Sequence, residues 1–472
     1  MPVLSKKQEI TVTVESLAFG GRGIARINNF VVFINKVLPG QTVRAVITRV
    51  KKSYAEAVAL QVLDESPWAI PPRCRHFGDC GGCQLQNLVY EQQLEAKSRQ
   101  VSELLHRIGG MDNFTLLPIL GSQDLYHYRN KMEFSFARER WLSAAEISAG
   151  EKIDRQGCFL GLHAGGFFGK VVDIEECRLI NPSAAAIVRC VREAARDSKL
   201  PVYSTIDHAG FWRFLVVRSS VLTDDLMVNV ITSTFKPEVA AILREKLMSA
   251  FPQITSLYNG VTRSKAAVAF CEEEHLLAGD RFIWEKIDDF RFRISPNSFF
   301  QTNSKQVKRL YEAVLQLAEP QGDETVFDLY CGAGTISIYV SPLVRQVIGF
   351  ESVASAVEDA RVNCQENGVD NCRFVLADLK DQLSGTQAII DSFGRPDLII
   401  LDPPRGGLHP KTVQAVLALS PKKIVHVSCN PATLARELEE FCRSDYMLGR
   451  VQPVDMFPHT AHIEVVAELI RK

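Results

Sequence analysis

Runs in which apolar and polar residues alternate fill the first part of the chain. Three of them lie between residues 8 and 62: "EITVTVESL", "NNFVVFI" and "QTVRAVITRVKKSYAEAVALQVL". The glycine clusters "FGGRG" and "LPGQ" separate these runs. Alternation with a period of two predicts β-strands, and about five short strands with glycine turns predict a small OB-like β-barrel over residues 1–65. Barrels of this kind commonly bind nucleic acids.

A middle region follows the linker "ESPWAIPP", whose consecutive prolines cannot continue a strand. The apolar spacing of "YEQQLEAKSRQVSELLHRIG" predicts a helix at about 91–109. From about residue 125, strand-like runs such as "FWRFLVVRSS" are mixed with helical runs such as "KPEVAAILREKLMSAF". We therefore expect a central α+β domain over residues 66–294. The 91–109 helix is also a candidate to pack on the domain that follows.

The pattern changes at about residue 295 to a regular alternation of strands and helices. The expected strands are "TVFDLYC", "QVIGFES", "CRFVLAD", "PDLIILDPP" and "KKIVHVSC". This alternation predicts a C-terminal α/β domain, 295–472, with a doubly wound, Rossmann-like parallel sheet. Two further strands, in "YMLGRVQPVDMF" and "HIEVVAELIRK", are expected to form an antiparallel hairpin at the sheet edge.

Composition describes an ordinary globular protein, because 46% of the 472 residues are hydrophobic and 23% are charged. The net charge of −1 alone does not indicate a nucleic-acid partner. Residues 1–62, however, hold nine Lys and Arg against three Glu. A basic module on a neutral body is one way to build a nucleic-acid binder, although a solvated surface has the same composition.

The N-terminus "MPVLSKKQEI" has no apolar core of a secretory signal, and we find no apolar run long enough to cross a bilayer. We therefore expect a cytoplasmic protein with no membrane partner. In that compartment the twelve cysteines should be reduced thiols or metal ligands rather than disulfides.

A short glycine loop, "FDLYCGAGTISI", separates a predicted strand from a helix. Ser337 replaces the third glycine of a dinucleotide fingerprint, and no lysine follows as in a phosphate loop. The next strand ends at Glu351, 23 residues after Asp328, where a carboxylate can bind ribose hydroxyls. Asp378 and Asp402 end the third and fourth strands. Each acid alone could cap a helix, but four together at strand ends indicate a ligand crevice.

This arrangement resembles the class I S-adenosylmethionine-dependent methyltransferases. An adenosine that carries a sulfonium instead of a pyrophosphate would explain the missing third glycine. "DPPRGG" resembles the D-P-P-[YF] loop of amino-methylating enzymes, but Arg405 stands in place of the aromatic residue. RNA cytosine-5 methyltransferases carry a cysteine after these prolines, and it is absent here. The nearest cysteine at the predicted sheet rim is Cys429, at the end of the fifth strand.

Cys429 would suit methylation at carbon 5 of a pyrimidine. A thiolate that adds to carbon 6 makes carbon 5 nucleophilic, and a base must later remove the carbon 5 proton. Because a free thiol is only slightly ionised near neutral pH, we expect the site to lower the pKa of Cys429. The N-terminus of the following helix, at "NPATLAR", is the expected cause. Glu464, in "FPHTAHIE", is the candidate base.

The motifs "SPNSFFQTN", "DLYCGAGT", "DPPRGG", "SCNP" and "DMFPHTAHIE" together resemble those of the RNA 5-methyluridine methyltransferases. The resemblance covers essentially the whole chain, and the N-terminal barrel resembles their TRAM domain. It implies that Cys429 is the nucleophile and Glu464 the base. It also implies a set of residues that bind S-adenosylmethionine, with Asp378 as a weaker member: Gln301, Tyr330, Glu351, Asp402 and Asp378.

A cysteine-rich stretch, "CRHFGDCGGC", places Cys74, Cys80 and Cys83 close together, and Cys177 lies far downstream. Three close thiolates with a distant fourth fit either zinc or an iron–sulfur cluster, and spacing alone does not choose the metal. Family members that resemble this pattern carry a [4Fe–4S] cluster. No electron partner is indicated, so the resemblance implies a structural or RNA-positioning role.

The RNA substrate must present an unstacked uracil to the thiolate. Arg129 and Lys131, in "YRNKMEFSFAR", and the basic barrel are candidates to hold phosphates, although a solvated strand face would look the same. In the family that this chain resembles, tRNA-directed members typically lack both the barrel and the cluster. The presence of both here favours 23S rRNA as the target. We also expect the enzyme to be a monomer. A tRNA target, a non-catalytic RNA-binding protein and an amino-group methyltransferase stay as alternatives.

Overall fold

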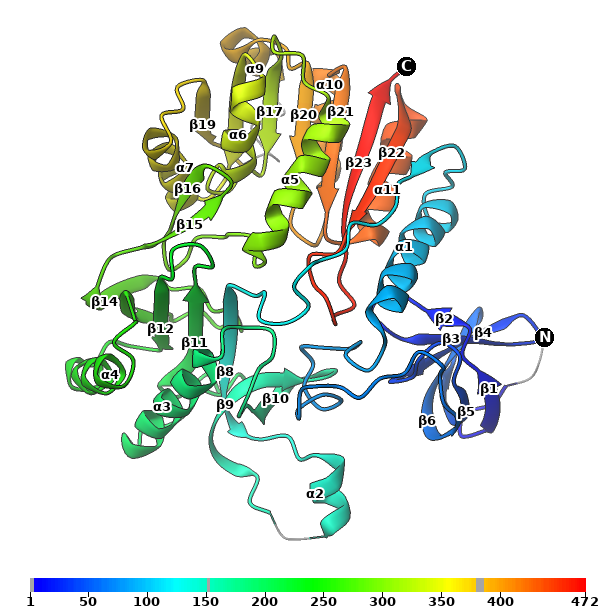
Figure 1. Cartoon of the computed structure of the whole chain (residues 1–472), viewed down its shortest axis with the longest axis vertical. Helices are drawn as coiled ribbons and strands as arrows, with labels where there is room; N and C mark the ends of the chain where they lie inside the picture. Colours follow the sequence, from blue (N-terminus) through cyan, green and yellow to red (C-terminus); the bar gives the residue numbers. More distant parts are fainter. Residues whose placement is uncertain (1–3, 151–152, 379–385) are drawn as a thin grey trace.

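The chain folds into three sheets, each with its own hydrophobic core, and a small hairpin (Figure 1). The computed structural model describes residues 4–150, 153–378 and 386–472. The sheets follow one another along the chain except that residues 90–116 return to the last of them.

The N-terminal sheet has six strands in the order β1-β5-β6-β4-β3-β2. They are β1 (Glu9–Thr13), β2 (Ser16–Leu17), β3 (Gly23–Ile27), β4 (Phe30–Asn35), β5 (Thr42–Val50) and β6 (Tyr54–Asp64). Side chains of β1 are buried at every second residue, as the alternation predicts. β1 also contacts β3, so the sheet curls around an apolar core. The alternating run "EITVTVESL" is divided between β1 and β2.

The central sheet has the order β10-β9-β8-β11-β12-β13-β14. Its strands are β8 (Lys131–Glu139), β9 (Gln156–Ala164), β10 (Phe167–Asp173), β11 (Trp212–Ser219), β12 (Leu226–Thr232), β13 (Ser256–Val261) and β14 (Glu273–Gly279). Two adjacent helices, α3 (Ser183–Asp197) and α4 (Pro237–Ala250), pack against it, and α2 (Ala144–Ala149) lies in a long excursion after β8 (Figure 1). The hairpin of β15 (Ile283–Ile287) and β16 (Phe290–Ile294) leads to the last sheet.

The last sheet has the order β19-β18-β17-β20-β21-β23-β22-β7. Its strands are β7 (Thr115–Leu116), β17 (Thr325–Leu329), β18 (Gln346–Glu351), β19 (Cys372–Leu376), β20 (Leu398–Leu401), β21 (Lys423–Ser428), β22 (Tyr446–Val454) and β23 (Glu464–Arg471). The strands from β17 to β21 pair in parallel, in the predicted doubly wound arrangement.

Helices cover both faces of this sheet (Figure 1). One face packs against α5 (Ser304–Ala318), α6 (Thr335–Val340) and α7 (Ala354–Glu366), and the short 3₁₀ helix η1 (Ser341–Leu343) follows α6. The other packs against α1 (Tyr90–Arg107), α9 (Thr386–Phe393), α10 (Pro410–Leu419) and α11 (Pro431–Arg443). The strands are buried on both sides, which explains why they appear in the sequence as continuous apolar runs.

The hairpin predicted at the sheet edge is only partly as expected. β22 and β23 are antiparallel, but β23 lies inside the sheet, between β21 and β22. β7 covers the outer side of β22. Glu464, the first residue of β23, is therefore 4% exposed and does not lie on a solvated edge.

Candidate active site

The glycine loop after β17 follows a tight path at the carboxyl end of the sheet. Tyr330 and Gly334 both have positive φ angles, +68° and +76°. A Cβ on Gly334 would lie 2.7 Å from the Phe374 ring, so this position requires glycine sterically as well as conformationally. The backbone N–H of Gly332 donates to Glu351 Oε2 at 3.1 Å. The loop and the end of β18 therefore form one surface.

Carboxylates concentrate under and beside this loop. Asp328 is fully buried, and burial raises its pKa to about 7, with further contributions from Asp402 and Glu351. The Ser337 hydroxyl donates to Asp328 Oδ2 at 2.6 Å. Asp328 Oδ1 has no hydrogen-bond partner among the described residues. Asp328 thus lies inside the strand rather than at its end as predicted. Acids that raise one another's pKa make a crevice suited to a cationic ligand.

Gln301 and Asp402 meet across this crevice, where Gln301 Nε2 lies 3.5 Å from Asp402 Oδ2. Burial raises the pKa of Asp402 to about 6. The buried Asn130 side chain donates to the Gln301 carbonyl at 2.9 Å and so holds this residue from the central domain. Asp378 lies two residues beyond β19 and is exposed, on the outer side of the same strand ends.

Cys429 and Glu464 come together at the end of an antiparallel ladder. Ser428 of β21 lies opposite Val465 of β23. Cys429 follows Ser428 in a bend and Glu464 precedes Val465, so the two residues lie directly beside the last pair of the ladder. The carboxylate of Glu464 is close enough to raise the pKa of the Cys429 thiol. Strand register therefore brings together two residues that are 35 positions apart in the sequence.

The expected lowering of the Cys429 pKa is wrong for this structure. Burial raises the pKa of the thiol to about 11, and Glu464 and Asp402 raise it further, whereas Arg405 lowers it. The Ala432 N–H at the N-terminus of α11 is already used, because it donates to the side chain of Asn430 at 3.1 Å. Pro431 also lacks an N–H to offer.

Burial also raises the pKa of Glu464 well above its usual value, and Asp402 acts in the same direction. A carboxylate with a raised pKa is a stronger proton acceptor when it is ionised. The crevice thus holds a thiol, a basic carboxylate and a cation-binding set of acids along adjacent strand ends.

Comparisons with known proteins agree with this geometry. Residues 261–472 match the family model "tRNA (Uracil-5-)-methyltransferase", and residues 5–60 match the TRAM domain. An uncharacterised RNA methyltransferase of Chlorobaculum tepidum is 41% identical over 91% of this chain and 89% of its own length. One of Bacteroides thetaiotaomicron is 41% identical over 96% of this chain and 99% of its own length.

The chain belongs to the RNA uracil-5 methyltransferase family. A solved structure of the Pyrococcus abyssi tRNA (uracil-54, C5)-methyltransferase, in complex with S-adenosyl-L-homocysteine, is similar over 98% of this chain and 100% of that chain. The two are 29% identical, with a TM-score of 0.72. The enzyme therefore methylates carbon 5 of uridine in RNA with S-adenosylmethionine, and it binds RNA through its TRAM and methyltransferase domains.

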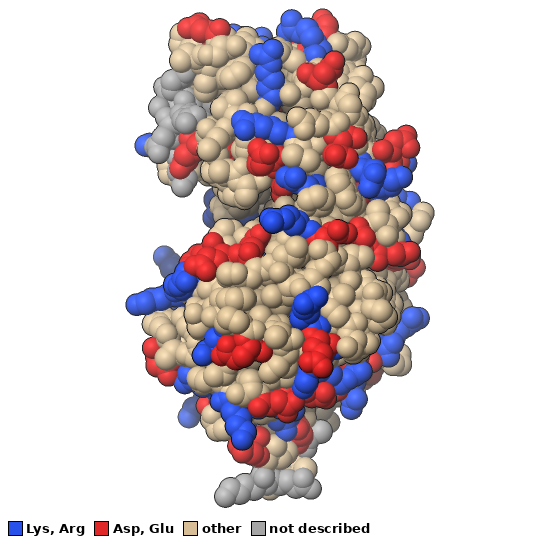
Figure 2. Space-filling view, turned by 90° about the vertical axis from the view of Figure 1, so that its left-hand side faces the viewer, with Lys and Arg blue, Asp and Glu red and all other residues tan. Residues whose placement is uncertain are grey.

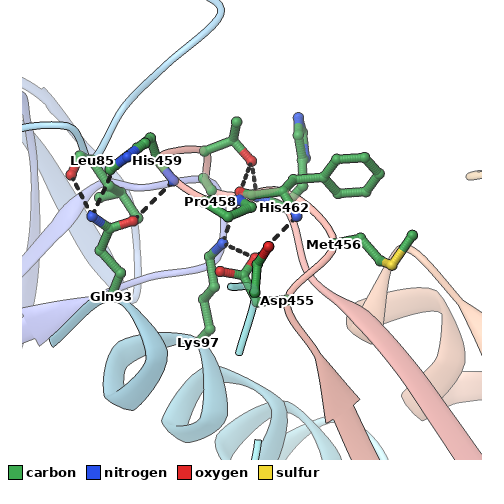
Figure 3. A network of polar contacts seen from close by, with 12 residues as sticks. Leu85, Gln93, Lys97, Asp455, Met456, Pro458, His459 and His462 are labelled. Atoms are coloured by element: carbon green, nitrogen blue, oxygen red, sulfur yellow. Dashed lines mark hydrogen bonds and ion pairs between the residues drawn. The ribbon is translucent and has the colours of Figure 1, made fainter. Parts of the chain in front are cut away.

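The segment between β22 and β23, residues 455–463, leads to Glu464 and is held from several sides (Figure 3). Lys97 of α1 is buried and lies 2.7 Å from Asp455 Oδ1, which is also buried. Gln93 receives a bond from the His459 N–H at 2.9 Å, and its own amide lies 3.2 Å from the His459 ring. The Tyr128 hydroxyl donates to the Pro458 carbonyl at 2.9 Å. The sequence contained no local signal for these partners.

The methyltransferase also has a cavity of about 500 Å³ that all four predicted cysteines line. Burial raises the pKa values of Cys80 and Cys83 to about 12, and both thiols interact electrostatically with Cys177 and Cys74. Burial also raises the pKa of Cys177. The sequence-distant cysteine is therefore brought to the other three. In the described ranges, no three or more His, Cys, Asp or Glu residues are arranged to hold a metal ion.

Arg129 and Lys131, the candidate phosphate contacts, differ in their surroundings. Lys131 forms an ion pair with Glu133 at 2.5 Å, so its charge is already compensated. Arg129 lines the cysteine cavity and lies over the Phe457 ring. Figure 2 shows one face of the enzyme, on which basic and acidic residues are intermixed, so this face offers no continuous basic track. No helix in the described parts of the chain has the length and apolarity to cross a bilayer.

Proposed function

We propose that Cys429 is the nucleophile and Glu464 the general base of uridine methylation. The observation that carries this proposal is their position at the end of the β21–β23 ladder, where the Glu464 carboxylate acts electrostatically on the Cys429 thiol. From these neighbouring positions one side chain can approach carbon 6 while the other faces carbon 5. S-adenosylmethionine supplies an electrophilic methyl group at this end of the sheet.

In the proposed order of reaction steps, Cys429 and Glu464 each have one role. The Cys429 thiolate adds to carbon 6, and the electrons of the carbon 5–carbon 6 double bond move toward the carbon 4 carbonyl. Carbon 5 then forms its bond to the methyl group while the bond between that methyl group and the sulfonium sulfur breaks, and S-adenosylhomocysteine would leave with the bonding pair. Glu464 takes the carbon 5 proton, the double bond re-forms, and the thiolate leaves carbon 6.

The crevice supports binding of S-adenosylmethionine by Gln301, Tyr330, Glu351 and Asp402. Its carboxylates suit a sulfonium and an ammonium, and Asp328 has an unpaired buried oxygen beneath the loop. Glu351 lies where a ribose would reach, although its Oε1 also accepts from the N–H groups of Ser352 and Val353. We propose the exposed Asp378 as a peripheral contact.

We propose that Cys74, Cys80, Cys83 and Cys177 hold a [4Fe–4S] cluster. A tetrahedral zinc with bonds of about 2.3 Å needs thiolates packed around one point. The four cysteines instead surround a cavity and are not arranged around a single ion, which suits a larger group. Amide donors to sulfur also suit a cluster: Gly82 N–H donates to Cys80 Sγ at 3.4 Å, and Gln86 to Cys83 Sγ at 3.2 Å. When bound, the cluster would cross-link the loop to residue 177.

We propose three functional parts: a TRAM barrel (1–65), a central domain with the cysteine site (66–294) and a methyltransferase domain (295–472) completed by α1 and β7. We propose 23S rRNA as the target, because the barrel and four cysteines occur together. A tRNA uridine is the second candidate, favoured by full-length similarity to the Pyrococcus abyssi tRNA enzyme. That similarity weakens the expectation that a tRNA enzyme lacks the N-terminal parts.

The test of the catalytic pair is Glu464→Gln. Without a base, methyl transfer proceeds but the carbon 5 proton remains, so the enzyme should stay covalently bound to methylated RNA. The adduct should survive a denaturing gel, and the Cys429→Ala enzyme should give none. Turnover of Glu464→Gln at the wild-type rate without an adduct would show that another group is the base.

The target is tested by digesting rRNA and tRNA separately from a deletion strain and measuring 5-methyluridine by mass spectrometry. Loss confined to the large-subunit rRNA supports the first candidate. Loss confined to tRNA rejects it and supports the second.

A further inference from the structure

The thiol of Cys429 lies in surroundings that oppose its ionisation. Two carboxylates, Glu464 and Asp402, act on it electrostatically, and the site is partly buried. The N–H groups at the start of α11 are unavailable, because Asn430 caps Ala432 and its carbonyl accepts from Thr433. A positive group from another element must therefore compensate the charge of a thiolate.

Arg405, in the loop after β20, is placed to do this. The Asn430 side chain, directly after Cys429, donates to the Arg405 carbonyl at 3.2 Å. Leu408 lies three residues after Arg405, and its N–H donates to the buried Glu437 carboxylate of α11 at 2.8 Å. A Cβ on Gly407, whose φ is +80°, would lie 1.9 Å from that carboxylate. Glycine at this position lets the loop close tightly against α11, which fixes its backbone beside Cys429.

The Arg405 side chain is also held in place, through its guanidinium. One guanidinium nitrogen lies 2.5 Å from His462 Nδ1. Burial lowers the pKa of His462 to about 4, and Arg405 adds to this effect, so the ring is neutral and can accept the bond near neutral pH. His462 precedes Glu464 by two residues, so the segment that presents the base also holds the arginine.

We propose that Arg405 is a catalytic partner of Cys429: its guanidinium, held by His462, hydrogen-bonds to Sγ and compensates the negative charge of the thiolate. The inference rests on the proposed role of Cys429 as nucleophile. In the activation step the S–H bond breaks, the proton leaves to water, and both bonding electrons stay on sulfur. The guanidinium remains protonated throughout. When the thiolate leaves carbon 6 at the end of the reaction, it returns to the same partner.

This role explains why an arginine follows the two prolines. In the amino-methylating enzymes that the loop resembles, an aromatic residue at that position stacks on the base. Here the reaction forms a bond between the protein and the base, and the demand is for charge beside the sulfur rather than for a stacking surface. Arginine keeps its charge at every pH at which the enzyme works, and its planar group can contact Sγ and His462 together.

The experiment measures the thiolate directly, without RNA. Cys429 is the only cysteine of the tryptic peptide from residue 424 to 436, so its alkylation by iodoacetamide can be followed by mass spectrometry. Arg405→Gln should slow alkylation of Cys429 at pH 8 about tenfold, equivalent to one pKa unit. Arg443→Gln, an exposed arginine at the far end of α11, is the control and should stay within twofold of wild type.

His462→Ala leaves the arginine present but free, and it should slow alkylation about threefold. Arg405→Lys keeps the positive charge but lacks the planar group of N–H donors. Its alkylation rate should lie between those of wild type and Arg405→Gln. Wild-type alkylation in Arg405→Gln overturns the proposal, and if RNA binding is then weakened, Arg405 is an RNA contact only. If Arg405→Gln does not bind S-adenosylhomocysteine, its site is disrupted, and the alkylation rate of Cys429 in His462→Ala then tests the proposal. Alkylation of His462→Ala at the wild-type rate rejects it.

The outcome is separable from that of the catalytic assignment. A covalent adduct in Glu464→Gln together with unchanged alkylation in Arg405→Gln rejects only the arginine role. Slowed alkylation in Arg405→Gln with no adduct in Glu464→Gln supports the contact between Arg405 and Cys429 but rejects Cys429 as the nucleophile.

Discussion

The catalytic crevice and the cysteine cavity are built in opposite ways. In the crevice, Cys429 and Glu464 follow directly from the register of two buried strands. In the cavity, Cys74, Cys80 and Cys83 lie on one loop, and Cys177 comes from a distant turn. The first site is positioned by a sheet that exists without it, whereas the second gathers two loops that lie outside the described helices and strands. We therefore expect catalytic substitutions to remove activity at little cost in stability, and cysteine-loop substitutions to do the reverse.

The largest effect is expected for Cys429→Ala. Loss of the nucleophile should lower the rate of methylation by roughly 10⁴-fold or more, because the alternative is attack by an unactivated carbon 5. Binding of S-adenosylhomocysteine, measured by calorimetry, should stay within about twofold. Cys442→Ala, on the next helix and away from the crevice, is the control and should keep near-wild-type activity. Loss of cofactor binding in Cys429→Ala would make Cys429 a structural residue.

The ion pair that holds the 455–463 segment should give the next largest effect. Lys97→Met leaves the fully buried Asp455 uncompensated, which should lower the free energy of unfolding by about 3–5 kcal/mol. Lys246→Met breaks an exposed pair with Asp197 and should cost less than about 0.5 kcal/mol in the same denaturation experiment.

Adding Asp455→Asn to Lys97→Met removes the stranded charge and should recover at least half of the loss. If Lys97→Met were no more destabilising than Lys246→Met, the pair would not hold the 455–463 segment.

Cys83→Ser tests the cavity. The purified wild type should be brown under anaerobic conditions with about four iron per chain, and the variant should lose both colour and iron. Because the cross-link closes a long loop, its loss should lower stability by roughly 2–3 kcal/mol while cofactor binding persists. Cys190→Ser, on α3, is a control that should keep the iron. Stoichiometric zinc without iron in the wild type would reject the cluster.

The smallest effect concerns pH. The pKa of Glu464 is raised in the folded state, so ionisation of this group penalises folding as pH rises above its unfolded value of about 4.5. Glu464→Gln lacks this penalty. It should be about 1–2 kcal/mol more stable than wild type at pH 8, and the difference should shrink toward pH 5.

Urea denaturation at both pH values measures this difference. The exposed Glu312→Gln should show no such dependence. A difference for Glu464→Gln that does not change with pH would mean that the carboxylate is not in the buried environment described.

Local patterns were enough to predict the parallel sheet, the glycine loop and most of the crevice residues. Alternation and strand-end positions depend on neighbours in sequence, so Glu351 and Asp402 could be placed without a structure. Glu464 was expected in a hairpin at the sheet edge, because nothing in its own segment indicates that β23 lies between β21 and β22 or that β7 lies beyond β22.

The pairing of Lys97 with Asp455 joins residues 358 positions apart, and no pattern within either segment encodes it. Arg405 was noticed only as a substitute for an aromatic residue, since its contact with His462 depends on two loops meeting. The predicted drop in the Cys429 pKa failed for a similar reason, because the capping of α11 and the nearby carboxylates are properties of the assembled site.

Asn130 has a mechanical consequence for the enzyme. The chain passes between the catalytic and central domains near residues 117–130 and again near 295–303, and Asn130 ties these two crossings together. Its N–H donates to the Thr302 carbonyl and its side chain to Gln301 and Ser304. These bonds restrain relative movement of the two domains directly beside the crevice, so Gln301 is held in its place from the side of the central domain.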